Sequence, residues 1–300
     1  MIEKHISISN ILIVGLARNC EAVIANEIKN INKAFSSAKN IEWIIVESDS
    51  NDRTSEVIKN LAKKYSINLI SLGNLIDEFP KRTARIAFCR NTYVEEINNN
   101  NLYSNIDYVV VADLDGVNNK INSNSVNSCW ETNLNWDACF ANQSAPYYDI
   151  WALRHKIWSP NDCNEQAKFL REFSSSQSAS AKAAIYSKMI TIPSNSNPIK
   201  VDSAFGGIGI YKKDAFKLGK YKGQDKKENQ VCEHIHFNEC LTKAGKILII
   251  NPKFINGGWN EHNRKYTRTL RLKSKLIESL ISFVTLFISK EKIKNIIYSK

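Results

Sequence analysis

The first 115 residues alternate short apolar runs with amphipathic stretches, and this alternation restricts the fold more than any other feature of the chain. Apolar runs that indicate buried strands cover residues 10–17, 41–47, 67–72 and 107–113. Apolar residues at helical spacing lie between them, at residues 23–31, 54–65 and 82–97. Strands that alternate with helices form βαβ units, in which parallel strands share one sheet and helices cover its faces. We therefore predict an α/β fold with a mostly parallel central sheet flanked by helices.

The fourth apolar run ends in two acidic residues, Asp113 and Asp115, followed by a glycine. Residues two apart on a strand point to the same side of the sheet, so these carboxylates can face one site together. Adjacent carboxylates repel each other, which favours a bound cation, and oxygen ligands favour Mg²⁺ or Mn²⁺ completed by substrate phosphates. Two turn-forming acids that merely close a strand are the alternative, and this stretch alone leaves both interpretations open.

Ligands of such sheets bind at the carboxyl ends of the strands, so the loops after the first, second and fourth strands should carry the site. These loops contain Arg18, residues 47–54 and residues 113–116. In the second loop, Ser50 or Asp52 would also suit a helix cap, which requires no ligand.

The second half of the chain has a weaker pattern. Expected elements are short strands at 137–142 and 149–154, a helix at 233–244 and a strand at 246–250. Residues 159–200 are expected as a long, serine-biased connection. The glycine-rich residues 204–211 lack G-x-G-x-x-G spacing, which excludes a dinucleotide fingerprint there.

Composition narrows the classes of partner. The net charge of +11 suits an anionic membrane surface or a phosphorylated substrate, whereas no recognisable module supports nucleic acid as a partner. The seven cysteines include no C-x-x-C pair, which argues against a disulfide framework and indicates a reducing cytoplasm. We expect no signal peptide, and the longest apolar stretch, residues 276–288, is too short to span a bilayer comfortably.

Four motifs resemble those of family 2 glycosyltransferases. Residues 46–54 are similar to the family's V-D-D-G-S-x-D-x-T opening, with a glutamate and a serine in place of its paired aspartates. Residues 84–91 are similar to its G-x-x-x-A-R-N helix, keeping Arg90 and Asn91 but with Arg85 near the glycine position.

The third motif is Asp113-Leu114-Asp115, which matches the D-x-D element of the GT-A fold. The fourth is residues 232–252, which resemble the family's E-D-x-x-L…G-x-x-I…P block. Glu233 keeps the glutamate of that block, and His234 replaces its aspartate. The four motifs occur in the family's order.

The resemblance implies a GT-A-like, Rossmann-type domain that uses a nucleotide-sugar donor and a divalent cation, Mn²⁺ or Mg²⁺. The cation would bind Asp115, with Asp113 supporting it or contacting the ribose, and a late histidine, His262, would be a third ligand. The implied donor-binding residues are Arg18, Glu47, Asp49, Asp52, Arg85, Arg90, Asn91 and Asp113. A guanidinium suits a phosphate because it can donate two hydrogen bonds at once. A solvated helix face is the alternative for Arg90.

The resemblance also places Glu233 where an inverting enzyme deprotonates the acceptor hydroxyl. A first-turn glutamate favoured by the helix dipole is the alternative. Residues 148–151 and 205–207 are more loosely similar to capsule-type mannosyltransferases. The candidate acceptor-binding residues are Tyr148, Asp149, Trp151, Arg154, Gly206 and Gly207. The aromatic members would equally suit a hydrophobic core.

We expect residues 1–118 to bind the nucleotide sugar and residues 119–262 to bind the acceptor, as halves of one domain. Residues 263–300 combine basic residues with an apolar stretch and are expected to form a basic amphipathic helical tail. Such a tail can lie on an anionic bilayer, which would place a cytoplasmic enzyme on the inner face of the membrane. Docking on the core is the alternative.

The predicted function is metal-dependent transfer of a sugar from a nucleotide-sugar donor to a glycan or lipid-linked cell-envelope acceptor. Two alternatives stay open: a nucleotidyltransferase with a similar fold, and a non-catalytic protein that binds a membrane surface.

Overall fold

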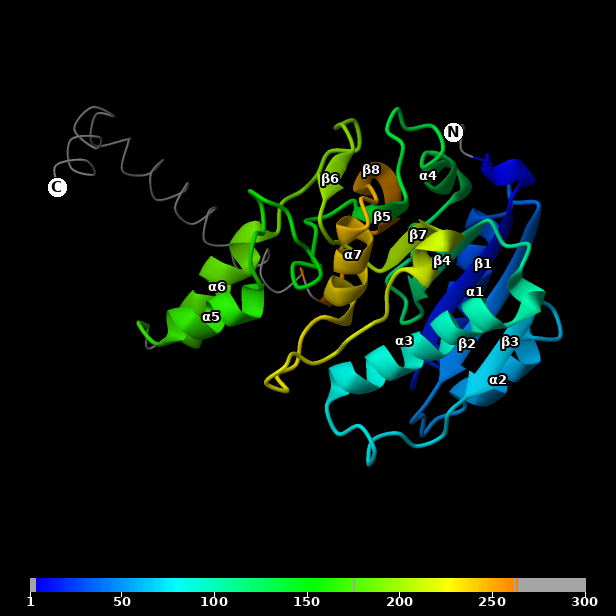
Figure 1. Ribbon diagram of the computed structural model, residues 1–300, viewed down its shortest axis with the longest axis horizontal. Coiled ribbons are helices and arrows are strands. Elements are labelled where there is room, and N and C mark those ends of the chain that lie inside the picture. Colours follow the sequence, from blue (N-terminus) through cyan, green and yellow to red (C-terminus); the bar gives the residue numbers. More distant parts are fainter. Residues whose placement is uncertain (1–3, 175, 262, 264–300) are drawn as a thin grey trace, which may run out of the picture. The chain divides into compact units, whose positions relative to one another are not determined.

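The computed structural model describes residues 4–174, 176–261 and 263, and the chain divides into two compact units, Met1–Gly258 and Trp259–Lys300. The first unit is built on an eight-stranded sheet with the strand order β3-β2-β1-β4-β7-β5-β8-β6 (Figure 1). In the second unit, the side chains of Asn260 and Asn263 each accept a hydrogen bond from the other's backbone.

The strands are β1 (Asn10–Ala17), β2 (Asn40–Glu47), β3 (Ile67–Ser71), β4 (Tyr108–Asp113), β5 (Ala138–Gln143), β6 (Ile199–Val201), β7 (Ile208–Lys212) and β8 (Leu248–Gly257). The α-helices are α1 (Ile24–Ala34), α2 (Thr54–Leu61), α3 (Arg82–Asn99), α4 (Ser123–Asn127), α5 (Cys163–Arg171), α6 (Gln177–Ala184) and α7 (Glu233–Lys243). Short 3₁₀ helices cover Ile6–Ile8, Asn101–Tyr103, Tyr186–Lys188 and Lys213–Lys217.

The sheet is mixed and mostly parallel, which confirms the predicted α/β fold. Strands β1 to β4 pair in parallel, β5 pairs in parallel with β8, and β7 runs antiparallel between β4 and β5. Strand β6 adds an antiparallel edge beside β8. The register sets Ala17 beside Glu47 and Leu16 beside Asp113, so the carboxyl ends of β1, β2 and β4 meet at one edge. Because β4 pairs with β7, the sheet continues across the predicted division at residue 118.

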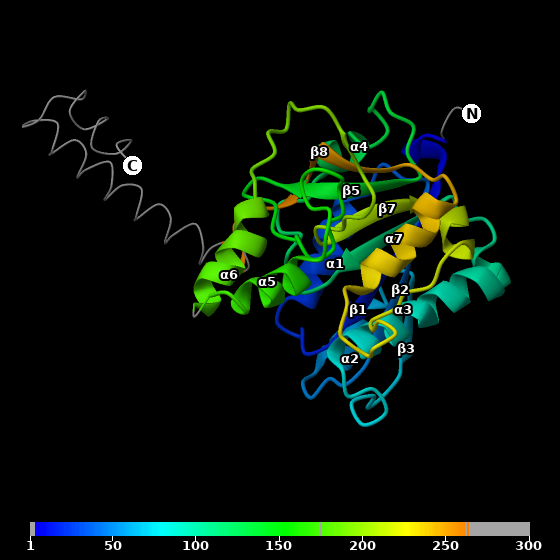
Figure 2. The same cartoon turned by 60° about the vertical axis from the view of Figure 1, so that its left-hand side comes forward.

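Two hydrophobic layers cover the sheet, because successive strand residues point to opposite faces. On one face, Leu12 and Val14 of β1 join a buried cluster that includes Tyr93 of α3 and Phe237 of α7. On the other face, alternate residues of the same strand pack in a cluster supplied by α1, α2 and α4. Figure 2 shows α3 and α7 together on one side of the sheet. Helices therefore pack on both faces of the sheet whose edge gathers the carboxyl ends of β1, β2 and β4.

Three expectations for the second half of the chain are wrong. Residues 149–154 form no strand; the structure has only an isolated bridge between Arg154 and Ser203 there, within a loop closed by short-range hydrogen bonds. Strand β8 does not end at Asn251-Pro252 but continues to Gly257. The β5–β8 register shifts at this point, and Asn142 Nδ2 donates to the Pro252 carbonyl at 3.0 Å, so a bulge accommodates the proline.

The third is the predicted long connection, residues 159–200, which contains two helices. Asp162 caps α5 by accepting hydrogen bonds from the backbone of the next turn, and Ser176 caps α6 in the same way. Among the residues that the structure describes, no helix is long and apolar enough to cross a membrane. The predicted tail beyond Asn263 lies outside the described residues, as does His262.

Candidate functional site

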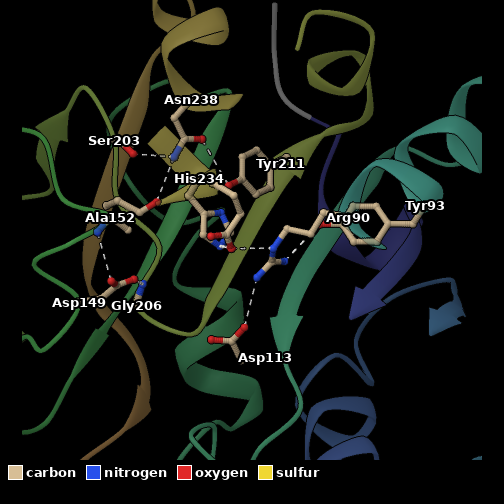
Figure 3. Close-up of polar contacts among 12 residues, drawn as sticks. Arg90, Tyr93, Asp113, Asp149, Ala152, Ser203, Gly206, Tyr211, His234 and Asn238 are labelled. Carbon is tan, nitrogen blue, oxygen red and sulfur yellow. Dashed lines mark hydrogen bonds and ion pairs between the residues drawn. The ribbon is translucent and has the colours of Figure 1, made fainter. Parts of the chain in front are cut away.

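Arg90, in the middle of α3, joins two acidic side chains that are far apart in the sequence. Its Nε donates to Glu233 Oε1 at 3.0 Å, and its Nη2 donates to Asp113 Oδ1 at 3.4 Å (Figure 3). Its Nη1 donates to Tyr93 Oη at 3.2 Å. The structure therefore brings together one predicted donor-binding residue, one predicted metal ligand and the predicted general base.

The acidic pair Asp113 and Asp115 lies where β4 leaves the sheet. Asp113 is half-buried and Asp115 is exposed. Burial, followed by the charge of Asp115, raises the pKa of Asp113 to about 8, while the Arg90 charge opposes the rise. Asp149 and Glu233 raise it further, which places both near the pair. This is an excess of negative charge that a cation would relieve.

The acidic pair fits a divalent cation in part. Two carboxylates with substrate phosphate oxygens can hold Mg²⁺ or Mn²⁺. Across the described part of the chain, no cluster of three or more His, Cys, Asp or Glu side chains could by itself hold a metal ion. The predicted third ligand, His262, lies outside the described residues. Substrate oxygens would therefore complete the coordination.

A buried polar network that sequence reasoning missed fixes the turn after β4. Asn118 Nδ2 donates to the Asp113 carbonyl and to Glu27 Oε1, both at 2.8 Å. Asn256 Nδ2 donates to Asn118 Oδ1 at 2.8 Å and to the Gly206 carbonyl at 2.9 Å. Burial raises the pKa of Glu27. The one sequence signal that could have found this network is the interruption of an apolar helix pattern by Glu27.

Gly206 and Gly207, just before β7, lie beside the acidic pair. Asp113 donates its backbone N–H to the Gly207 carbonyl at 2.9 Å, and Asp149 Oδ2 accepts from the Gly206 N–H at 3.0 Å. Both glycines have left-handed backbones, with φ of 73° and 92°. A Cβ on Gly207 would lie 2.9 Å from Tyr148 Oη, so glycine is required on two counts. Four of the predicted acceptor-binding residues thus gather at the site.

The other two predicted acceptor-binding residues, Trp151 and Arg154, serve the loop itself. Both donate to Asp162 Oδ2, from Trp151 Nε1 at 3.1 Å and from Arg154 Nη2 at 2.9 Å. Arg154 Nη1 also donates to the carbonyls of Trp151 at 3.0 Å and Leu153 at 2.8 Å. These contacts tie the loop to the start of α5.

The loop after β2 is held by its own acidic side chains. Asp49, with φ of 55°, accepts the backbone N–H groups of Leu75 at 2.8 Å and Ile76 at 3.0 Å. Asp52 accepts from the backbone N–H and hydroxyl of Thr54, the first residue of α2, although the N-cap position itself is Arg53, whose side chain makes no capping hydrogen bond. The Thr54 hydroxyl lowers the pKa of Asp52.

Two more of the predicted donor-binding residues, Glu47 and Arg18, lie at the carboxyl ends of β2 and β1. Glu47, the last residue of β2, is buried and accepts a hydrogen bond from the Ser50 N–H at 3.3 Å. Arg18, just after β1, is exposed, and its Nε donates to the Asp49 carbonyl at 3.4 Å. Of the predicted donor-binding cations, Arg18 is the one that the fold leaves open to solvent.

Two predicted donor-binding residues of α3 instead secure neighbouring loops. Arg85 Nη1 donates to the carbonyls of Phe79 at 2.6 Å and Pro80 at 3.0 Å, and its Nε lies 3.9 Å from Asp49 Oδ2. Asn91 exchanges two hydrogen bonds with the backbone of Tyr221, at 2.9 and 3.0 Å.

Helix α7 presents Glu233 in its first turn. Asn238, one turn further on, anchors the helix by donating to Ser203 Oγ at 2.9 Å and to the Ala204 carbonyl at 3.1 Å (Figure 3). These partners lie just before the Gly206-Gly207 turn. The helix that carries Glu233 is therefore fixed to the segment that leads into the glycine turn.

His234, which replaces the aspartate of the resembling family, is 3% exposed and stacks on Phe205 with ring centroids 3.9 Å apart. Its Nε2 lies 3.6 Å from Glu233 Oε1, and neither ring nitrogen has a hydrogen-bond partner among the described residues. Burial, reinforced by the Arg90 charge, holds the pKa of His234 well below its usual value. His234 is therefore a neutral, buried imidazole beside the base candidate.

Comparisons with known proteins give structural likeness alone. A scan against protein-family models found no match, and a search of curated proteins found no matching relative. Similar solved structures include S. aureus TarS 1–349 in complex with UDP-GlcNAc (TM-score 0.45, 11% identity, covering 85% of this chain and 60% of that one). Another is the mannosyltransferase PcManGT from Pyrobaculum calidifontis in complex with GDP-Man and Mn²⁺ (TM-score 0.45, 14% identity, covering 85% and 58%). This chain spans less than two thirds of each of these chains, and likeness of this degree carries no conclusion about function.

Proposed function

We propose that this protein is a metal-dependent glycosyltransferase that moves a sugar from a nucleotide-sugar donor to a glycan or lipid-linked cell-envelope acceptor. The observation that carries the proposal is the convergence of the Asp113-Asp115 pair, Arg90 and Glu233 at the carboxyl edge of β4. Three of the four sequence motifs that resemble family 2 glycosyltransferases supply these residues.

The acidic pair would hold Mn²⁺ or Mg²⁺, which would stabilise the negative charge of a departing nucleoside diphosphate. Arg18 is exposed at the same edge and can bind a phosphate oxygen through its guanidinium. Glu47, Asp49 and Asp52 shape the loop after β2, which would receive the nucleoside. The acidic residues of that loop already brace the backbone, so a donor would meet a rigid surface.

Glu233 would accept the proton of the acceptor hydroxyl as that oxygen attacks the sugar, which would invert the anomeric centre. A general base must be held within hydrogen-bond reach of the proton that it removes. The 3.0 Å contact with Arg90 and the anchoring of α7 at Asn238 restrict the carboxylate of Glu233 in this way. The same arginine also binds Asp113, which belongs to the proposed cation site.

The acceptor would lie against Tyr148, Asp149 and the Gly206-Gly207 turn, which is adjacent to the acidic pair through the Asp113–Gly207 hydrogen bond. A sugar ring can stack on the aromatic face of Tyr148 and bind its hydroxyl. The basic tail, residues 263–300, would bring the enzyme to an anionic membrane that carries a lipid-linked acceptor.

The test is sugar-nucleotide turnover in the presence of Mn²⁺, with UDP-GlcNAc and GDP-Man among the donors and sugar release or transfer as the readout. We expect the wild-type protein to turn over at least one donor and Asp115→Ala to lose about 100-fold or more of kcat. Asp214→Ala removes an exposed carboxylate that pairs with Lys217 instead, and should behave as wild type. Full metal-dependent turnover by Asp115→Ala would remove the site, and release of pyrophosphate from a nucleoside triphosphate would favour a nucleotidyltransferase.

A further inference from the structure

Three nitrogens of the Arg90 guanidinium each donate to a different side chain: Nε to Glu233, Nη1 to Tyr93 and Nη2 to Asp113. Two of these acceptors are carboxylates supplied by distant segments of the chain, at 3.0 Å for Glu233 and 3.4 Å for Asp113. These contacts use three of the five guanidinium N–H groups, so most of its donors are already paired within the protein.

Two aromatic rings also lie close to the same guanidinium. The ring centroids of Phe205 and Tyr221 lie 5.4 and 5.5 Å from Arg90 Cζ, within the range of cation–π attraction. Arg90 is 4% exposed, whereas Arg18 at the same sheet edge is exposed. Of these two arginines, only Arg18 faces solvent, so only Arg18 is open to a ligand that arrives from solution.

We infer that Arg90 is a positioning residue that fixes the carboxylate of Glu233 relative to that of Asp113, so that the proton-accepting group and the cation site form one unit. This inference rests on the proposed function and assigns the phosphate contact to Arg18. Buried carboxylates require a paired cation, and a bidentate or bridging guanidinium also sets their directions. Arg90 meets both requirements for Glu233 and Asp113.

A consequence is competition for Asp113. The carboxylate of Asp113 is shared between Arg90 and any cation bound at the acidic pair, because one negative charge faces two positive partners. At a pH at which Asp113 is ionised with or without Arg90, removal of the Arg90 charge should therefore strengthen binding of Mn²⁺ alone, since the repulsion between guanidinium and metal disappears. If Arg90 served only to bind a substrate phosphate, its removal would leave the affinity for Mn²⁺ unchanged in the absence of nucleotide.

The experiment compares Arg90→Gln, Arg90→Lys and Arg18→Gln in the full-length protein. It measures Mn²⁺ affinity without nucleotide, affinity for UDP and GDP with Mn²⁺, and the kcat and donor KM of transfer. For Arg90→Gln we expect Mn²⁺ to bind about tenfold more tightly, nucleoside diphosphate affinity to stay within about threefold, and kcat to fall about 100-fold or more. For Arg18→Gln we expect an effect on binding and not on the chemical step. The affinity for nucleoside diphosphate should fall and the donor KM should rise about tenfold, with kcat little changed.

Arg90→Lys keeps the charge but replaces the planar fork with one ammonium, and it covers the case in which Arg90→Gln does not fold. It should retain diphosphate affinity and still lose about 30-fold in kcat, because an ammonium at that position cannot hold both carboxylates in direction. Loss of diphosphate affinity in either Arg90 variant, to the extent seen for Arg18→Gln, would overturn the inference. Unchanged Mn²⁺ affinity in Arg90→Gln would do the same.

These outcomes separate the inference from the proposed function. If the wild-type protein turns over no sugar nucleotide but Arg90→Gln binds Mn²⁺ more tightly, the bridge stands and the glycosyltransferase assignment falls. If the wild-type protein does transfer sugar and Arg90→Gln raises donor KM while kcat is preserved, the assignment stands and the bridge falls. Failure of the wild-type protein to bind Mn²⁺ both alone and in the presence of UDP or GDP would remove both.

Discussion

At the scale of single residues, the contacts that join the candidate site are those of Arg90 with Asp113 and Glu233. Asp113, Arg90 and Glu233 were all predicted from the resemblance, and they do lie together. Asn91 and Arg154 were predicted by the same reasoning, yet their polar atoms secure loops. A motif gives a residue's position in the fold, whereas the direction of its side chain depends on neighbours supplied by distant segments.

His234 should make stability depend on pH. Its pKa is held far below the usual 6.5 in the folded protein, so below that pH the unfolded chain binds a proton that the folded protein excludes. The contribution of His234 to stability is thus fully present above about pH 6.5 and falls by about 1.4 kcal/mol per pH unit below it. Asp113, whose pKa the fold raises to about 8, contributes with the opposite sign as pH falls, so the effect of His234 is read as the difference in slope between wild type and His234→Phe. The check is the free energy of unfolding in urea between pH 7 and pH 5.

His234→Phe keeps an aromatic ring against Phe205 and removes both nitrogens. This variant should lose that acid sensitivity and be as stable as wild type, or more so, at neutral pH, because two unsatisfied buried nitrogens disappear. His5→Gln, at an exposed site, is the matched control and should keep the wild-type slope. An unchanged slope in His234→Phe would assign the acid sensitivity to other groups.

Gly207→Ala should disrupt the Gly206-Gly207 turn, which accepts a backbone hydrogen bond from Asp113. The new Cβ would lie 2.9 Å from both Tyr148 Oη and Val117 Cγ2, on a backbone with φ of 92°. We expect a loss of stability of about 2–4 kcal/mol, from the left-handed backbone and the steric clash together. Urea unfolding measures it.

Gly73→Ala is the matched control, because Gly73 also has positive φ, 68°, but open space around its Cβ position. This variant should lose only the backbone contribution, about 1–2 kcal/mol. Equal losses at the two positions would mean that Tyr148 and Val117 move aside without cost.

At the scale of elements, the first four strands and their helices follow from local periodicity, and the predicted bounds agree closely with β1 to β4. The turn after β4 could not be predicted in the same way. Its shape depends on Asn118, whose partners come from α1 and from the turn before β7 through Asn256. Strand β8 was cut short in prediction because a proline usually ends a strand, whereas here the neighbouring strand supplies a bulge.

Asn118→Ala should therefore destabilise the turn that carries the acidic pair. Glu27 would lose a donor in an environment that already raises its pKa, and the Asp113 carbonyl would lose another. We expect a cost of about 2–3 kcal/mol in unfolding free energy, together with weaker Mn²⁺ binding. Urea unfolding and Mn²⁺ titration measure the two effects.

The control for this variant is Asn60→Ala, on the exposed side of α2. The side chain of Asn60 accepts a hydrogen bond from the exposed ammonium of Lys63, so its removal should leave both quantities unchanged. Wild-type Mn²⁺ affinity in Asn118→Ala would mean that the turn keeps its shape without the buried network.

At the scale of the whole molecule, the sheet order beyond β4 could not be predicted, because β7 inserts antiparallel between β4 and β5 through pairings between distant segments. Periodicity identifies strands but not their partners. The first half of the chain, by contrast, pairs neighbours in the way that βαβ units dictate.

The tail should govern membrane attachment. A protein that ends at Asn263 loses a segment rich in lysine and arginine, so it should bind anionic liposomes at least about tenfold more weakly than the full chain in low salt. Co-sedimentation with vesicles that contain phosphatidylserine measures this, with neutral vesicles as control. Equal binding by the shortened protein would place membrane attachment elsewhere or remove it.

The bridge between α3 and α7 spans 143 residues of sequence, and β7, the strand that follows the glycine turn, inserts between β4 and β5, which are both made before it. During synthesis on a ribosome, the amino-terminal strands can pair long before Glu233 emerges. The cluster of Arg90, Asp113 and Glu233 is therefore incomplete in every partial chain that ends before Glu233. Such a chain would lack the proposed base, even if its first four strands had already folded.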